Sequence, residues 1–282
     1  MQPPKLISTA AALALVAGLG LGVITTAAAA GPPEYVALGD SAAAGPLIPS
    51  VDPNLLCLRS RDNDYPAVAS RALGATLTDV TCSGATTAHF TQKQFGVTAP
   101  QFDALKPTTD LVSLTIGGND VGLVSLALTC LNLFPEPFGR SCADTELAKG
   151  DPTAAKIDAW APTLGAALET IRRRSPGAKV LVAGYATYIR PGGCHGTQPI
   201  WARDADYVQG LVNRLNTALR TQAAAHGATY VDIAAASVGH DTCAAPARRY
   251  IEGLIPTSPA APLHPNGKGM AAFGDAVAAA AR

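Results

Sequence analysis

The sequence predicts an α/β fold in which a five-stranded parallel sheet lies between two layers of helices. Short β-rich apolar runs alternate along the chain with segments of helical periodicity. The expected strands are residues 35–38, 75–80, 111–116, 179–183 and 229–233. Because strands separated by helices pair in parallel and are covered on both faces, we expect a flavodoxin-like three-layer α/β/α sandwich.

Two of the intervening segments have one apolar face at helical spacing, which is more typical of helices packed on a core than of a ligand site. The first stripe precedes a Ser-Pro-Gly sequence at 175–177 that is expected to end the helix. The stripes are Ile157, Trp160, Leu164, Leu168 and Ile171, and Val208, Leu211, Leu215 and Leu219. No internal repeat or linker in the sequence suggests a second domain.

The first 30 residues are typical of a secretory signal. Lys5 is their only charged side chain, and a long run of Ala, Leu, Val and Gly ends in Thr-Thr-Ala-Ala-Ala-Ala. These small residues predict cleavage after Ala28 or Ala30, which would leave residues 31–282 as the mature domain. The run is also long enough for a membrane anchor. We favour cleavage and secretion, without lipid attachment because no cysteine lies near the cleavage site.

After cleavage the chain is almost uncharged overall. The full sequence has 21 basic and 21 acidic side chains, and loss of residues 1–30 removes only Lys5. This balance gives no electrostatic reason to bind nucleic acid or an anionic membrane surface. Aromatic residues, at 5%, offer little surface for base stacking. We therefore expect a neutral or apolar substrate.

Three short sequences, far apart in the chain, carry the side chains that ester hydrolysis needs. Gly-Asp-Ser at 39–41 follows the first expected strand, and Gly-Gly-Asn-Asp at 117–120 follows the third. His-Pro-Asn at 264–266 precedes an alanine-rich helical tail. Serine, histidine and asparagine can act as nucleophile, base and oxyanion donor. Because ligands bind at the carboxyl edge of a parallel sheet, these sequences predict a hydrolytic site there.

The candidates near the strands also have structural interpretations. Ser41 can cap the turn that follows it, and Asn119 after two glycines is common in turns. Gly84 follows another apolar run and is a third candidate, since its backbone N–H can also reach an oxyanion. Each signal is weak when it is taken alone.

His264 differs from the other histidines because it is fixed between Pro262 and Pro265. A rigid backbone that holds an imidazole in place suits a general base. A single loop histidine is more often inert, so its combination with the other sequences is what favours function. The remaining four are His226 at an expected helix end and His89, His195 and His240 in polar or glycine-rich stretches.

Together, and in this order, these sequences resemble the blocks of the SGNH (GDSL-type) hydrolase family. Residues 39–41 resemble the first block, Gly84 the second, residues 117–120 the third and His264 the fifth. The resemblance runs from about Tyr35 to the C-terminus. The sequence is most similar to the secreted actinobacterial lipase and esterase branch of this family. The resemblance implies the SGNH hydrolase fold for residues 31–282.

The resemblance also implies a role for each matching residue. Ser41 would be the nucleophile and His264 the base. The oxyanion hole would consist of the Ser41 N–H, the Gly84 N–H and the Asn119 side chain.

The chain departs from the family pattern at Ala261. The family places an aspartate three residues before the histidine to orient the imidazole, and alanine has no carboxylate. In the secreted branch a backbone carbonyl can take this role, so we expect the Ala261 C=O to orient His264 in a Ser-His dyad. A triad with a distant acid, Asp232 or Asp241, is the alternative.

Six cysteines in an exported chain predict disulfides, and their spacings match no zinc pattern, so no metal site is expected. Fifteen pairings are possible. Sequential pairing closes the shortest loops and agrees with the branch that the chain resembles: Cys57–Cys82, Cys130–Cys142 and Cys194–Cys243. The first pair would brace the turn that carries Gly84, although simple stapling of surface loops explains it equally well.

We therefore expect a secreted, cofactor-free carboxylic ester hydrolase that acts through an acyl-enzyme. Its partner would be a small-molecule or lipid ester, with no nucleic acid, no stable membrane insertion after signal cleavage, and a monomeric state. One alternative keeps the fold and changes the bond: phospholipid or thioester hydrolysis, or deacetylation of a polysaccharide. The other is a secreted binding protein that has lost catalysis.

Overall fold

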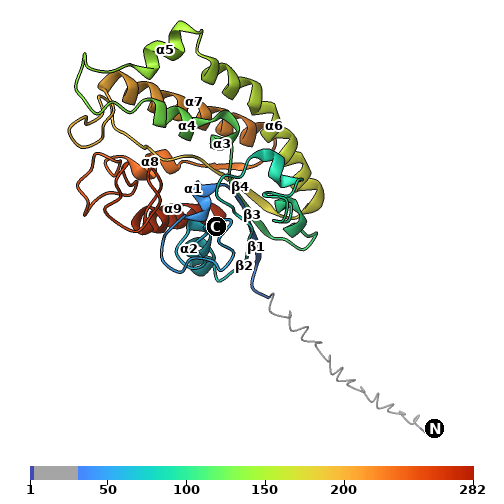
Figure 1. Cartoon of the computed structure of the whole chain (residues 1–282). Coiled ribbons are helices and arrows are strands. Elements are labelled where there is room, and N and C mark those ends of the chain that lie inside the picture. Colours follow the sequence, from blue (N-terminus) through green and yellow to red (C-terminus); the bar gives the residue numbers. More distant parts are fainter. Residues whose placement is uncertain (3–30) are drawn as a thin grey trace. The chain divides into compact units, whose positions relative to one another are not determined.

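Five strands form a single parallel sheet, as the sequence predicts (Figure 1). The computed structural model describes residues 1–2 and 31–282, so the predicted signal lies outside the described residues apart from its first two. The strands are β1 (Glu34–Gly39), β2 (Thr76–Asp79), β3 (Leu111–Thr115), β4 (Lys179–Ala183) and β5 (Thr229–Val231). Their order across the sheet is β2-β1-β3-β4-β5, and every neighbouring pair is parallel.

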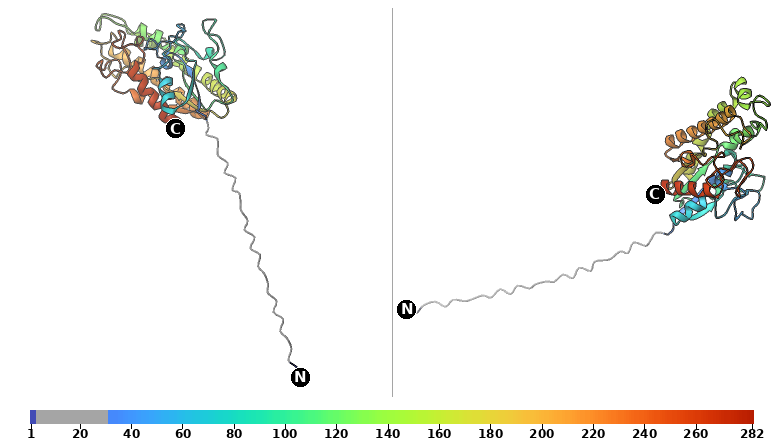
Figure 2. Two further views of the ribbon diagram at one scale, coloured as in Figure 1. Left: turned by 90° about the horizontal axis from the view of Figure 1, so that it is seen from below. Right: turned by 90° about the vertical axis from the view of Figure 1, so that its left-hand side faces the viewer.

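Helices cover both faces of this sheet and complete the predicted three layers (Figure 1). The long helices α6 and α7 lie on one face, and α2 and α9 pack side by side on the other, as all the views agree (Figures 1 and 2). The described α-helices are α1 (Ser41–Ala44), α2 (Tyr65–Leu73), α3 (Gly118–Val121), α4 (Leu123–Thr129), α5 (Cys142–Ala148), α6 (Pro152–Arg174), α7 (Ala202–Ala225), α8 (Ile233–Ser237) and α9 (Gly267–Ala281). Two 3₁₀ helices are η1 (Thr87–Phe90) and η2 (Gln101–Ala104).

Alternating side chains of β1 pack in two different hydrophobic cores, one on each face of the sheet. Val36 and Leu38 pack in the cluster that contains α6 and α7, whereas Tyr35 and Ala37 pack in the cluster that contains α2 and α9. Successive side chains of a strand point to opposite faces of its sheet. A strand that is covered on both faces is therefore apolar throughout, which is why this run stands out in the sequence.

The two predicted helical stripes form α6 and α7, and all nine of their apolar side chains are buried. Helix α6 starts where the Asp151 side chain accepts a hydrogen bond from Ala154 N at 3.1 Å, with Pro152 in its first turn. Proline suits this position because the first N–H groups of a helix have no partner within the helix. The helix ends at Arg174, just before the Ser-Pro-Gly sequence.

The structure contains the three predicted disulfides, Cys57–Cys82, Cys130–Cys142 and Cys194–Cys243. The first joins the segment before α2 to the chain that carries Gly84. Beside it, Cys82 N donates a 3.0 Å hydrogen bond to the Gly39 carbonyl at the end of β1. The turn at Gly84 is thus held both by a covalent bond and by the sheet.

In residues 1–2 and 31–282, none of the helices combines the length with the apolarity that crossing a membrane requires.

Removal of the Cys57–Cys82 disulfide should lower the stability of the fold and also the kcat of the ester hydrolysis that the family resemblance implies. It closes a separation of 25 residues, for which the chain-entropy model gives about 3–4 kcal/mol. The Cys57→Ser/Cys82→Ser variant should melt at a lower temperature and turn over an acetyl ester more slowly, because the Gly84 turn loses its support.

The matched control is Cys194→Ser/Cys243→Ser, which opens a disulfide of separation 49 that does not adjoin the Gly84 turn. It should melt earlier as well, while its kcat on the acetyl ester stays close to that of the unmodified chain. Equal kcat values for both variants, measured below their melting temperatures, would show that the first disulfide is only a staple.

Candidate active site

Ser41 lies at the carboxyl end of β1, where the chain turns sharply into α1. Gly39 has a φ of +140°, and a Cβ at this position would meet the Thr115 carbonyl oxygen at 2.5 Å. Only glycine fits this approach of β1 to β3. The Gln101 side chain binds both backbone groups of Gly39, at 2.8 Å to N and 2.9 Å to O. Asp40 then caps α1 by accepting from Ala42 N at 2.9 Å.

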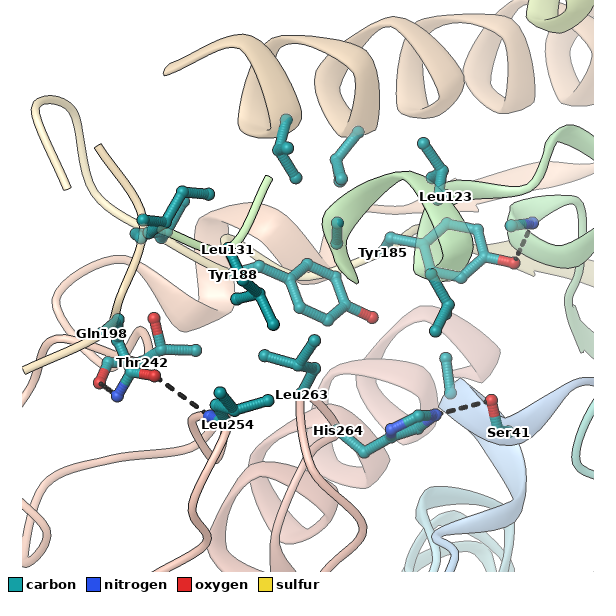
Figure 3. Close-up of a pocket in the computed structure, with 18 of the residues that line it drawn as sticks. Ser41, Leu123, Leu131, Tyr185, Tyr188, Gln198, Thr242, Leu254, Leu263 and His264 are labelled. Atoms are coloured by element: carbon teal, nitrogen blue, oxygen red, sulfur yellow. Dashed lines mark hydrogen bonds between the residues drawn. The ribbon is translucent and has the colours of Figure 1, made fainter. Parts of the chain in front are cut away.

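His264 reaches Ser41 from the loop before α9 (Figure 3). Its Nε2 lies 2.7 Å from Ser41 Oγ, and its Nδ1 lies 2.7 Å from the Pro262 carbonyl oxygen. A carbonyl only accepts hydrogen bonds, so Nδ1 carries the proton and Nε2 is left to accept from the serine hydroxyl. This is the tautomer that a general base for Ser41 needs.

The carbonyl that orients His264 belongs to Pro262, and the expectation for Ala261 was wrong. The Ala261 carbonyl accepts from the backbone N–H of His264 at 3.2 Å. It therefore closes the turn and is not the partner of the ring. Leu263 has a φ of +60°, and this uncommon backbone turn comes directly after the Pro262 carbonyl that the ring meets.

Neither proposed distant acid contacts His264. Asp232 caps α8 through Ala235 N at 3.0 Å and pairs with Arg220 at 2.9 Å. Asp241 pairs with Arg190 at 3.1 Å. In the part of the chain that the structure describes, the hydrogen-bond partners of the His264 ring are Ser41 and Pro262.

The backbone around His264 is held by a buried polar group. Glu252 N donates to the His264 carbonyl at 2.9 Å, and the Glu252 carboxylate accepts from Asn266 Nδ2 at 2.6 Å. Asn266 in turn caps α9 by accepting from Lys268 N and Gly269 N. The imidazole thus projects from a loop that is fixed on both sides.

Burial lowers the pKa of His264 below its usual value of 6.5, and the hydrogen bond to the Pro262 carbonyl offsets part of this effect. Among residues 1–2 and 31–282, no carboxylate forms a hydrogen bond with the ring that would raise the pKa again. The imidazole is therefore neutral at pH 7 and free to accept a proton.

Three hydrogen-bond donors belong to Ser41, to Asn119 in the lining of the same pocket, and to the turn of Gly84 that adjoins Asn119. Within the described residues, neither the Ser41 N–H nor the Gly84 N–H has an acceptor. Asn119 Nδ2 donates to the Ala85 carbonyl at 2.9 Å, which fixes the amide beside the Gly84 turn and leaves its second N–H available. The sequence predicts these same donors for an oxyanion.

Asn119 is positioned by a turn that requires glycine at residue 117. Gly117 has a φ of +117°, and a Cβ there would lie 2.5 Å from the Trp160 ring. Asp120, which follows Asn119, accepts a hydrogen bond from Thr87 N at 3.0 Å. Helix α3 is thereby joined to the chain that follows Gly84.

Asp40 and Tyr185 link the two turns through a contact between residues 145 positions apart in the sequence. The Tyr185 hydroxyl donates to the Asp40 carboxylate and accepts from Gly118 N at 2.7 Å. Burial raises the pKa of Asp40 to about 7, although the hydrogen bonds from Tyr185 and Ala42 act in the opposite direction. One phenol thus fixes the turn of Ser41 against the turn of Asn119.

An apolar pocket, partly open to solvent, adjoins Ser41. Figure 3 shows Ser41 and His264 at one end and Gln198 and Thr242 at the other. Tyr188 lies between these ends. Apolar lining residues include Leu123, Leu131, Ile200, Val208, Leu254 and Leu263. The cavity suits a hydrocarbon chain attached to a carbonyl at Ser41.

Residues 31–282, together with the first two, include no group of three or more His, Cys, Asp or Glu side chains that could hold a metal ion.

Comparison with known proteins identifies the family. The family model described as GDSL-like lipase/acylhydrolase matches residues 37–272. The chain belongs to this family. The match spans the candidate serine, glycine, asparagine and histidine, in agreement with the resemblance that their sequence context carries.

Relatives of the chain are lipases and esterases of Streptomyces. Lipase 2 of Streptomyces coelicolor is 42% identical over 274 residues, which cover 92% of this chain and 91% of the relative. An esterase of Streptomyces scabiei is 31% identical, with 93% of this chain and 90% of the relative covered. The chain is accordingly a carboxylic ester hydrolase of the GDSL-like family.

Two solved structures have a similar fold. Phospholipase A1 from Streptomyces albidoflavus NA297 has a TM-score of 0.74 at 28% identity. An extracellular lipase from Streptomyces rimosus has a TM-score of 0.74 at 27% identity. Each comparison covers 89% of this chain and 100% of the other.

The pH dependence of kcat/KM should have an acid limb with a midpoint below 6.5. Protonation of His264 removes the acceptor for the Ser41 proton, and burial lowers the pKa at which this happens. Activity on a non-ionising ester should therefore rise through this limb and be level by neutral pH.

The control for this profile is Asp40→Asn, because burial raises the pKa of Asp40, in the same site, to about 7. An inflection near pH 7 that disappears in this variant belongs to Asp40. A midpoint above 6.5 that persists in Asp40→Asn would contradict the lowered pKa of His264.

Tyr185→Phe should lower the free energy of unfolding by about 1–3 kcal/mol, because the buried Gly118 N–H loses its acceptor. The value of kcat should fall too, since the turns of Ser41 and Asn119 lose their link. Denaturant titration and steady-state kinetics measure the two effects.

Tyr188→Phe is the matched control for this prediction. The Tyr188 hydroxyl lines the same pocket, and in the described residues it makes no hydrogen bond. Its removal should cost less stability than removal of the Tyr185 hydroxyl. An equal loss in both variants would argue against the linking role of Tyr185.

Proposed function

We propose that this ester hydrolase is a secreted serine esterase or lipase that acts through Ser41 and His264 with an acyl-enzyme intermediate. The observation that carries the proposal is the hydrogen-bonded series from Ser41 Oγ through the His264 ring to the Pro262 carbonyl, with 2.7 Å at each step. The series supplies the serine with a base of defined tautomer at the end of an apolar pocket.

The reaction begins as His264 Nε2 takes the proton from Ser41 and Oγ attacks the acyl carbonyl. The negative charge that develops on the carbonyl oxygen is stabilised by the Ser41 N–H, the Gly84 N–H and the Asn119 side chain. His264 then gives its proton to the alcohol oxygen, and the alcohol leaves. Water activated by His264 attacks the acyl-enzyme and releases the carboxylic acid.

The Pro262 carbonyl takes the place that a carboxylate holds in a Ser-His-Asp triad. It keeps the proton on Nδ1, which orients the ring for Ser41. Because a carbonyl carries no net charge, it stabilises the imidazolium less than a carboxylate does. The lowered pKa of His264 fits this arrangement.

The pocket favours an ester of a hydrocarbon acyl chain. Its lining is almost entirely apolar, with leucine, isoleucine and valine side chains along its length, which argues against a polysaccharide deacetylase. Phospholipids carry such acyl chains, and one structural neighbour is a phospholipase A1. A hydrolysis profile from acetyl to palmitoyl esters, with a phosphatidylcholine added, separates esterase, lipase and phospholipase activity.

Secretion is supported by the signal-like sequence at 1–30, the three disulfides and the extracellular lipase among the structural neighbours. Disulfides persist in oxidising compartments outside the cytosol. The proposed mature chain begins after Ala28 or Ala30.

Ser41→Ala should abolish covalent labelling by a serine-directed phosphonate and lower kcat by roughly 10³-fold or more, as removal of a nucleophile does in other serine hydrolases. Ser83→Ala is the control, because Ser83 lies in the neighbouring turn. The phosphonate should label Ser41 in this variant as it does in the unmodified chain. Near-normal turnover by a folded Ser41→Ala protein would exclude Ser41 as nucleophile. An unmodified chain that neither reacts with the phosphonate nor hydrolyses any ester would be a binding protein.

A further inference from the structure

We propose that the exposed apolar residues of α4 and of the loop between α4 and α5 dock the protein on a lipid surface. This docking surface consists of Val124, Leu128, Leu133, Phe134 and Phe138. The proposal rests on the proposed function, because it assigns the acyl ester to a lipid surface from which it enters the pocket.

Large apolar side chains in this region face solvent. Leu133 is 77% exposed, Phe134 66% and Phe138 73%, and all three lie within a stretch of six residues. Val124 and Leu128, on the outer face of α4, are exposed as well. Isolated apolar residues are common on protein surfaces, but a concentration of this kind marks a site of interaction.

The loop is held firmly in this exposed position. The Cys130–Cys142 disulfide closes its base. Asn132 exchanges two hydrogen bonds of 3.0 Å with the backbone of Arg140, and Trp201 Nε1 donates to the Phe134 carbonyl at 2.9 Å. The apolar side chains are therefore presented by an ordered backbone, so docking does not need to order the loop first.

The docking surface is continuous with the wall of the pocket. Leu131 pairs with Ile200 in a β-bridge, and Asn132 N donates to the Pro199 carbonyl at 2.7 Å. Leu131, Pro199 and Ile200 all line the pocket. Val124 is both exposed and part of the pocket lining. Figure 3 shows Leu131 on the side of the pocket away from Ser41.

This continuity favours a lipid surface over another protein. An acyl chain that leaves a lipid layer at these residues would pass along apolar side chains into the pocket without entering water. The segment 131–141 carries one acidic and one basic residue, Glu136 and Arg140, so its net charge is zero. The expected surface is consequently uncharged or zwitterionic, and apolar contact supplies the affinity.

The test measures binding and catalysis separately. Binding of the protein to vesicles of diether-linked phosphatidylcholine, which contains no ester bond, is measured by flotation. Activity is measured on a soluble butyrate ester below its aggregation concentration. Leu133→Ser/Phe134→Ser should weaken vesicle partition by tenfold or more, because two exposed apolar side chains become polar. Its kcat/KM on the soluble ester should change by less than about twofold.

The matched control is Leu55→Ser/Leu56→Ser, another adjacent pair of exposed apolar residues. The segment before α2 that contains this pair lies far from α5 in Figure 1. This control should leave both readouts unchanged. If Leu133→Ser/Phe134→Ser is unstable in thermal melting, the single Phe138→Ser variant, which should weaken partition severalfold, replaces it.

Unchanged vesicle partition in the loop variant would overturn the proposal, and so would an equal loss in the control. The proposal would also be overturned if the unmodified chain sediments as a dimer and the loop variant as a monomer. The surface would then bind a second copy of the chain. Failure of the proposed function gives a different pattern: vesicle binding persists, but the soluble ester is not hydrolysed.

Discussion

The parallel pairing of β1 with β3 is the constraint on which the candidate site depends. Gly39 lies beside Thr115 in the register, and Asp40 N donates to the Thr115 carbonyl at 2.9 Å. The two strands therefore end at the same level, so that Ser41 and Asn119 leave the sheet side by side. The tight approach leaves no room for a side chain on Gly39, and a shift of register would separate the proposed nucleophile Ser41 from the proposed oxyanion donor Asn119 by the length of a residue.

The parts of this arrangement that depend on local pattern could be predicted from the sequence. Buried strands appear as apolar runs, α6 and α7 as apolar stripes, and the turns as glycines before Ser41 and Asn119. Their meeting point follows from topology, because the carboxyl ends of parallel strands share one edge. The family resemblance added the order of the blocks and the role of His264. The carbonyl that orients this histidine was assigned to the wrong residue. Whether the Pro262 or the Ala261 oxygen faces the ring depends on backbone torsions such as the φ of +60° at Leu263, and leucine rarely adopts this conformation.

Side chains that act on the site from a distance could not be predicted, because nothing near them in the sequence indicates their partner. Gln101 binds Gly39 across 62 residues, and Tyr185 binds Asp40 across 145. Tyr185 does follow β4 at the same edge of the sheet, which was a usable but unspecific signal. Gln101 lies in a short 3₁₀ helix that offers none. Both contacts are created only when the tertiary fold brings their segments together.

The use of a main-chain oxygen beside His264 has a consequence for how the site changes in evolution. A carboxylate partner can be deleted by one codon change, whereas every residue that could replace Pro262 still brings a carbonyl. What a substitution can alter is the direction of that carbonyl, through the torsions of its neighbours. The orienting group is thus inherited with the shape of the loop, and a search for a third conserved side chain would overlook it.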